Sequence, residues 1–68
     1  MQIRYSPDAD VLVIRFREGR PVDSIDVVEG VIAHISEDNK VLEIEILDAS
    51  KVVDLENITF TGLRWVRI

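Results

Sequence analysis

The stretch that decides the fold is Val41-Leu42-Glu43-Ile44-Glu45-Ile46-Leu47, which runs directly into Asp48-Ala49-Ser50-Lys51. Apolar and acidic residues alternate in its first part, which is the pattern of a β-strand with one buried and one wet face. The alternation stops at Asp48, whose carboxylate suits the N-cap of a helix. We therefore predict a strand over 41–47 and, after it, one short helix over about 48–56.

Turn-forming residues divide the rest of the chain into further short strands. The predicted strands are 3–5, 11–17, 22–28 (a weak edge strand), 31–35 and 41–47. Loops at 6–10 and 37–40 make hairpins, and one or two more strands are expected after residue 57. The predicted fold class is α+β: an antiparallel β-meander sheet with one short helix packed on it and a C-terminal strand, in a single domain of residues 1–68.

The alternation assigns the apolar side chains to two faces. One face, which should pack against the helix and the C-terminal strand, carries Leu12, Ile14, Phe16, Ile35, Leu42, Ile44 and Ile46. Val11, Val13 and Ile32 fall on the opposite face and leave apolar surface in need of cover. A domain of 68 residues has a marginal core, and this one has no cysteine for disulfides. We therefore expect a homodimer or a bound protein partner.

The net charge of −5 is unevenly distributed along the chain. Residues 1–20 carry four arginines against three acids, residues 21–57 carry ten acids against two lysines, and residues 58–68 carry two arginines. The acidic surface disfavours nucleic acid, because it repels phosphates. No apolar run is long enough to cross a membrane and no signal peptide opens the chain, so a cytoplasmic protein without membrane contact is expected.

Few residues offer chemistry, and we predict no catalytic, cofactor-binding or metal-binding site. Asp8, Asp10 and Asp48 could gather around a hard cation, but their spacing fits turn formers and a helix cap better. His34 could move a proton, yet no nucleophile motif accompanies it, and Glu43 and Glu45 fit a solvent-facing strand. The alternative function is a small ligand-binding protein or enzyme that uses this acidic and histidine surface; it requires a pocket that joins two of Asp8, Asp10, His34 and Asp48.

A basic and aromatic cluster, Arg64, Trp65 and Arg67, lies near the C-terminus. Arginine and tryptophan are enriched in interface hot spots, although Trp65 could equally fill the core of a final strand. The candidate interface residues are Val11, Val13, Ile32, Arg64, Trp65 and Arg67.

Three stretches, 5–14, 30–32 and 44–50, together resemble the small bacterial and archaeal family called domain of unknown function 2283. They read YSPDADVLVI, GVI and IEILDAS, and the resemblance runs from about Ile3 to Ser50. Ser6 stands where the family commonly has Asp, which weakens the case for a metal-binding acidic turn. The resemblance implies no catalytic residue. Some members are encoded beside small toxin-like proteins, so the expected function is a non-catalytic protein-interaction module, in the form of an antitoxin-like partner of a small basic toxin.

Overall fold

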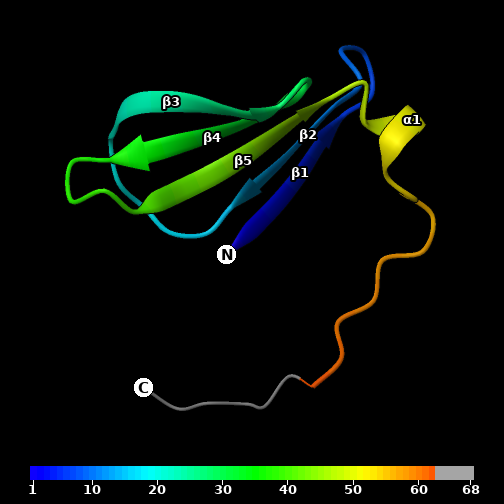
Figure 1. Ribbon diagram of the computed structural model, residues 1–68. Helices are drawn as coiled ribbons and strands as arrows, with labels where there is room; N and C mark the ends of the chain where they lie inside the picture. The colour runs from blue at the N-terminus through cyan, green and yellow to red at the C-terminus, as the bar shows by residue number, and fades with distance from the viewer. Residues whose placement is uncertain (63–68) are drawn as a thin grey trace.

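The computed structural model describes residues 1–62, which form one antiparallel sheet and a single helical turn (Figure 1). The elements are β1 (Gln2–Ser6), β2 (Val11–Arg15), β3 (Pro21–Val28), β4 (Val31–Ser36), β5 (Val41–Leu47) and α1 (Ala49–Val52). The α+β class, the antiparallel sheet and the single short helix confirm the prediction.

The strand order is β1-β2-β5-β4-β3. A β1–β2 hairpin and a β3–β4–β5 meander are joined where β2 pairs with β5, so the chain is not one uninterrupted meander. The segment 22–28 forms an edge strand as predicted. An interior position suits β5 because Ile44 lies opposite Ile14, and Ile46 opposite Leu12, in the ladder with β2.

The predicted loops are confirmed, and residues that tolerate a left-handed backbone stand at their bends. Asp10 (φ 55°) ends the loop between β1 and β2, and Asn39 (φ 63°) lies in the loop between β4 and β5. Gly30 (φ 82°) turns the chain between β3 and β4. Asp, Asn and Gly are the residues for which this conformation costs least.

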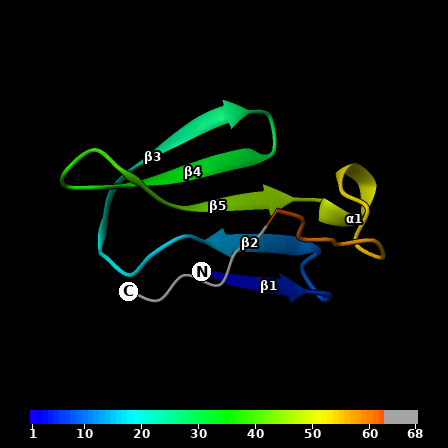
Figure 2. The same cartoon turned by 90° about the horizontal axis from the view of Figure 1, so that it is seen from below.

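The helix is shorter than the predicted 48–56. It covers Ala49–Val52 only, and Val53 is already extended. Consecutive β-branched valines weaken a helix that is too short to be stable alone. Figure 2 shows α1 at the end of β5, beside the turn of the β1–β2 hairpin. Ala49 of α1 is fully buried.

The predicted N-cap at Asp48 is wrong. Asp48 is itself left-handed (φ 51°, ψ 43°), whereas a capping residue is normally extended, and its side chain makes no cap hydrogen bond. Asp10 performs this role from the β1–β2 turn, as described below.

The described part of the C-terminal segment, residues 53–62, extends away from the sheet without regular structure (Figure 1). The strand expected at 58–61 is therefore absent from it. The side chains of Ile58 and Phe60 are 52% and 58% exposed, so the local alternation gains no packing that would stabilise a strand. The strand expected at 63–68, and with it Arg64, Trp65 and Arg67, lies outside the described residues. Within residues 1–62 no helix has the length and hydropathy needed to cross a membrane.

Candidate functional site

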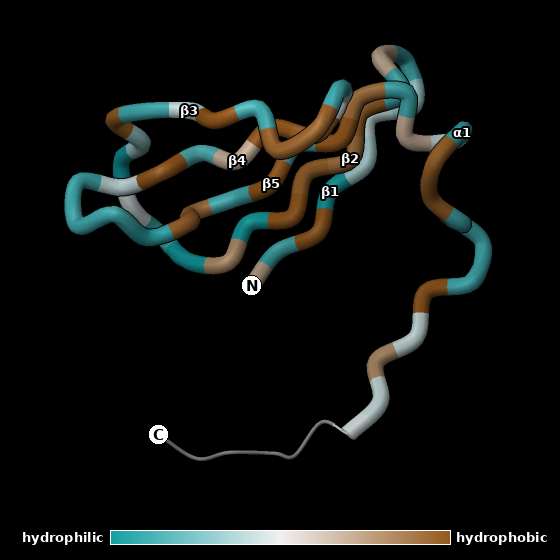
Figure 3. The backbone as a smooth tube through the Cα atoms, in the orientation of Figure 1, coloured by the Kyte–Doolittle hydropathy of each residue, from teal (hydrophilic) through white to brown (hydrophobic). Residues whose placement is uncertain are grey.

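One face of the sheet is built almost wholly from apolar side chains; we call it the apolar face. The strand registers place its residues in two rows that cross all five strands. The first row is Ile3, Ile14, Ile44, Ala33 and Ile25, and the second is Tyr5, Leu12, Ile46, Val31 and Val28. The alternation of apolar and polar residues that produces it is visible along β5 in Figure 3.

Short segments cover the apolar face only near its two ends. The connection between β2 and β3 lies so close to Leu42 that a Cβ on Gly19 would come within 2.7 Å of a Leu42 methyl group, and Leu42 is 1% exposed. At the other end Ala49 of α1 is fully buried. Among the described residues 1–62, no helix or strand lies across the rows between these ends (Figure 1).

Exposure rises toward both edges of the apolar face. Leu12 and Ala33 are buried in the middle, and Ile14, Ile44 and Ile46 are half-buried. At the margins Ile3 is 38% exposed and Ile25 50% exposed. The helix and C-terminal strand that were expected to cover this face do not do so within the described residues, so it is the face most in need of a partner.

The opposite face is polar, although it carries the predicted interface residues Val11, Val13 and Ile32. The registers confirm that these residues lie on that face, where all three are half-buried. Val13 and Ile32 both lie opposite Glu45 in their ladders. The charged Glu45 therefore separates Val13 from Ile32, and these two residues form no continuous apolar surface.

Side-chain hydrogen bonds tie the strands of the polar face together. Arg15 Nη1 donates a hydrogen bond of 2.6 Å to Glu43 Oε1 on the neighbouring strand, and both side chains are about three-quarters buried. His34 Nε2 lies 3.0 Å from Glu45 Oε1. These contacts give Glu43 and His34 structural partners, in keeping with the interpretation of both as ordinary sheet residues.

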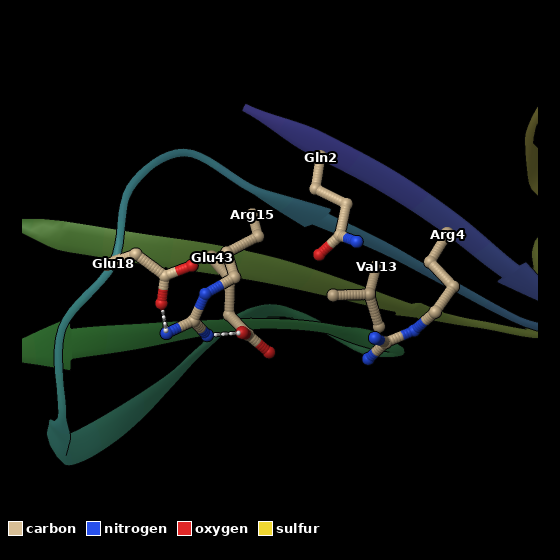
Figure 4. A pocket seen from close by; sticks show the side chains of 6 residues that line it. All are labelled: Gln2, Arg4, Val13, Arg15, Glu18 and Glu43. Atoms are coloured by element: carbon tan, nitrogen blue, oxygen red, sulfur yellow. Dashed lines mark hydrogen bonds and ion pairs between the residues drawn. The ribbon is translucent and has the colours of Figure 1, made fainter.

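A small hollow of about 190 Å³ opens on the polar face (Figure 4). Its lining residues are Gln2, Arg4, Val13, Arg15, Glu18 and Glu43. Arg15 reaches between Glu43 and Glu18, and its Nη2 also donates to the Gly19 carbonyl at 3.0 Å. The charges inside the hollow thus largely neutralise each other, which leaves no strong field for an ionic ligand.

One hydrogen-bond cluster joins the β1–β2 turn to α1. Asp10 Oδ1 accepts from the Ser50 N–H (2.9 Å) and from the Tyr5 hydroxyl (2.7 Å), while Oδ2 accepts from the Ser50 hydroxyl (2.6 Å). The Asp10 carbonyl also accepts from the Ala49 N–H at 3.0 Å. Asp10 therefore caps the helix from a distant part of the chain, a role that no local sequence signal predicts.

The protonation states of this cluster follow from its hydrogen bonds. The Ser50 and Tyr5 hydroxyls, which donate to the carboxylate, hold the pKa of Asp10 below its ordinary value. The same bond raises the pKa of Tyr5, because the phenol must give up its donated proton to ionise. A carboxylate whose pKa is lowered and whose oxygens already accept these hydrogen bonds is a poor general base for Ser50.

A second cluster, which we did not predict, fastens the loop between β4 and β5. Arg17 Nη2 donates to Ser36 Oγ (3.0 Å) and to Asp38 Oδ1 (2.9 Å), and the Ser36 hydroxyl donates to Asp38. The Ser36 hydroxyl, followed by Arg17, lowers the pKa of Asp38. The Ser-x-Asp spacing at the start of a loop is the sequence signal that could have indicated it.

The residues named for the alternative function do not form one site. Asp8, Asp10 and Asp48 belong to the end of the sheet where β1 turns into β2 and β5 meets α1, whereas His34 pairs with Glu43 inside the sheet. Three hollows on the surface of residues 1–62 have none of these four side chains among their lining residues. Among residues 1–62 no three acidic or histidine side chains are grouped for a metal ion.

The fold defines a small α+β domain built on one five-stranded antiparallel sheet. The sequence model of the family described as "Protein of unknown function (DUF2283)" matches residues 2–50, and the chain belongs to this family. The matched segment spans all five strands and includes both Asp10 and Ser50. The chain matches no curated protein and no solved structure.

Proposed function

We propose that this protein is a non-catalytic interaction module that binds a protein partner on its apolar face. The observation that carries the proposal is the pair of apolar rows, which cross five strands without a helix or strand over them in residues 1–62. Apolar patches of this kind mark interaction surfaces in small proteins. The proposal assigns the binding surface to the apolar face and not to Val11, Val13 and Ile32.

Charge supports a basic protein as the partner. Ten of the thirteen acids lie in residues 21–57, the segment that holds β3, β4 and β5. Several of these acids, such as Glu43, Glu45 and Asp26, lie on the polar face, so their charge acts on a basic partner by long-range attraction, which accelerates association. We therefore propose the antitoxin-like form of the function: a small basic protein sits on the apolar face and is neutralised by it.

Two further features belong to the proposal. The domain acts as a homodimer, because a sheet with so few buried side chains gains from association. It works in the cytoplasm, because a chain without cysteine has no disulfide bond that reducing conditions could break.

The test compares one isoleucine on each face. Ile14 and Ile32 are both half-buried residues of interior strands, Ile14 on the apolar face and Ile32 on the polar face. Tagged wild-type protein, Ile14→Lys and Ile32→Lys are purified from the native host, and circular dichroism checks the fold of each. We expect a stoichiometric basic protein with the wild type and Ile32→Lys but not with Ile14→Lys. The absence of any stoichiometric partner, or its loss from Ile32→Lys alone, would contradict the proposal.

A further inference from the structure

The two edges of the sheet differ in their capacity to accept another strand. On β3 the edge is blocked: Pro21 has no N–H, and the register shifts between Pro21 and Asp23 and between Asp26 and Val28. The outward Ser24 N–H is already occupied, because it donates to Asp23 Oδ1 at 2.8 Å. Proline, bulges and charged side chains are the devices that protect an edge strand from pairing.

The β1 edge has neither a proline nor a bulge, and Arg4 is its one charged side chain. Its register with β2 is continuous over all five residues, from Gln2 opposite Arg15 to Ser6 opposite Val11. The sequence of β1 is QIRYS, with no proline and no acid. An edge of this kind is open to strand addition.

The ladder also shows which backbone groups of β1 are free. Phe16 donates its N–H to the Leu42 carbonyl of the neighbouring β5 at 2.7 Å, so the even-numbered residues of β2 face β5 and the odd-numbered ones face β1. Gln2, Arg4 and Ser6 lie opposite those odd-numbered residues and complete the ladder. Ile3 and Tyr5 therefore direct their N–H and C=O groups outward, where no group of residues 1–62 bonds them.

We propose that β1 is the homodimer interface: it pairs antiparallel with β1 of a second copy, about a two-fold axis at Ile3. The inference rests on the proposed homodimer and gives it a geometry. The result is a continuous ten-stranded sheet in which the outward groups of Ile3 in each copy bond those of Ile3 in the other.

The register follows from the chemistry of β1. Side chains that lie opposite each other in the two β1 strands point to the same face of the sheet only if the axis passes through a residue of β1. An axis between two residues would pair apolar with polar positions. An axis at Arg4 sets two guanidinium groups directly opposite each other, which is destabilising. An axis at Tyr5 sets Ile3 opposite Pro7, which has no N–H and lies beyond the end of β1. An axis at Ile3 sets Gln2 opposite Arg4 and apolar residues opposite each other.

This dimer and the proposed partner binding do not compete. A two-fold axis perpendicular to the sheet keeps both apolar faces on the same side, so the row that begins at Ile3 continues into the second copy. The second copy thus binds through the self-complementary edge of β1. Dimerisation enlarges the apolar face and leaves it free for the basic partner.

The test removes one outward N–H from each edge of the full chain. Ile3→Pro deletes the Ile3 donor and leaves the bonds from β1 to β2 intact, and Ser24→Pro is the matched change on the blocked β3 edge. Light scattering after gel filtration, over a range of micromolar concentrations, gives the mass. We expect a wild-type dimer, an unchanged Ser24→Pro dimer, and an at least roughly tenfold rise in the dissociation constant of Ile3→Pro, because the two-fold axis doubles the loss.

Amide hydrogen exchange of the wild type keeps the test decisive if Ile3→Pro does not fold. Pairing through β1 predicts slow, concentration-dependent exchange at Ile3 and Tyr5, while the outward Asp26 amide of β3 exchanges fast. Fast exchange at Ile3 in a dimeric wild type, or an Ile3→Pro dimer with the dissociation constant of the wild type, overturns the β1 interface and leaves the homodimer standing. A wild type that is monomeric throughout overturns both.

Discussion

Asp10 accepts hydrogen bonds from both the N–H (2.9 Å) and the hydroxyl (2.6 Å) of Ser50, which lies 40 residues further along the chain. This contact ties the first hairpin to α1 and fixes where the chain leaves the sheet. The contact joins two of the stretches that resemble the family, 5–14 and 44–50, and gives both of them a structural role.

Removal of the Ser50 hydroxyl should destabilise the fold. Ser50→Ala loses the bond to Asp10 Oδ2 and leaves that carboxylate oxygen to water, so we expect the thermal midpoint to fall by roughly 4–8 °C, the equivalent of about one net hydrogen bond in a domain of this size. Asp8→Ala is the control, because Asp8 lies in the same turn and its side chain makes no hydrogen bond within residues 1–62. Equal thermal midpoints for Ser50→Ala and the wild type would contradict a stabilising contact between Asp10 and Ser50.

Acid should weaken the same contact. The pKa of Asp10 is lowered in the folded chain, so its contribution is present above the ordinary carboxyl value of about 3.9 and is lost as the pH falls through the folded value. Urea unfolding at pH 6 and at pH 3 should show a smaller loss of stability for Asp10→Asn than for the wild type. The same loss in both proteins would mean that Asp10 does not contribute.

Alkali should act through Tyr5 in the opposite sense. Because the folded pKa of Tyr5 is raised, its contribution is present below the ordinary value of about 10 and is lost as the pH rises through the folded value. Tyr5→Phe should remove this part of the alkaline dependence. An absorbance titration of the phenolate, with the midpoint at or below the ordinary value, would contradict the hydrogen bond to Asp10.

The ion pair inside the polar face should outweigh the one at its rim. Glu43→Gln is expected to cost roughly 1 kcal/mol, because the Arg15–Glu43 contact is 2.6 Å long and mostly buried. Glu18→Gln should cost less than about 0.5 kcal/mol, since Glu18 is 95% exposed and lies 3.5 Å from Arg15. Urea titrations of both variants measure the difference. Equal costs would show that solvent screens the two pairs alike and would contradict the prediction.

Cysteine cross-linking can read the register of the proposed dimer. With the axis at Ile3, two Ile3→Cys side chains lie directly opposite each other, within the range of a disulfide, whereas two Tyr5→Cys side chains are several residues apart. The chain has no cysteine of its own, so each variant reports a single site. Oxidation should link Ile3→Cys and not Tyr5→Cys; the opposite result would move the axis to Tyr5.

The sequence predicts the sheet better than it predicts what surrounds the sheet. Alternation and turn residues identify all five strands, because each strand needs only its own period and the glycine, asparagine or aspartate at its ends. The pairing of β2 with β5 is a long-range choice that local pattern does not encode. The same limit explains why the predicted N-cap at Asp48 is wrong. The carboxylate that accepts the hydrogen bond from the Ser50 N–H belongs to Asp10, which is distant in the sequence, and not to Asp48.

The candidate site was predicted only in part. Strand alternation correctly separates Val13 and Ile32 from Ile14 and Ile44, but which face stays open depends on the cover provided by α1 and residues 53–62. A helix of four residues at the end of the sheet cannot span it. Helix length and tail packing are decided by tertiary contacts, so the apolar face was mistaken for a covered core.

Solvent access to the apolar face in solution is the most direct test of the account. A soluble paramagnetic probe broadens the methyl signals of side chains that it can approach, and Leu42, at 1% exposed, is the internal reference for a protected methyl. In the free full-length protein we predict clear broadening for Ile14 and Ile44 and none for Leu42, with the Ile14 and Ile44 signals protected once the basic partner is added. Ile14 and Ile44 methyls as protected as those of Leu42 in the free protein would contradict the central claim, because the face would then already be covered.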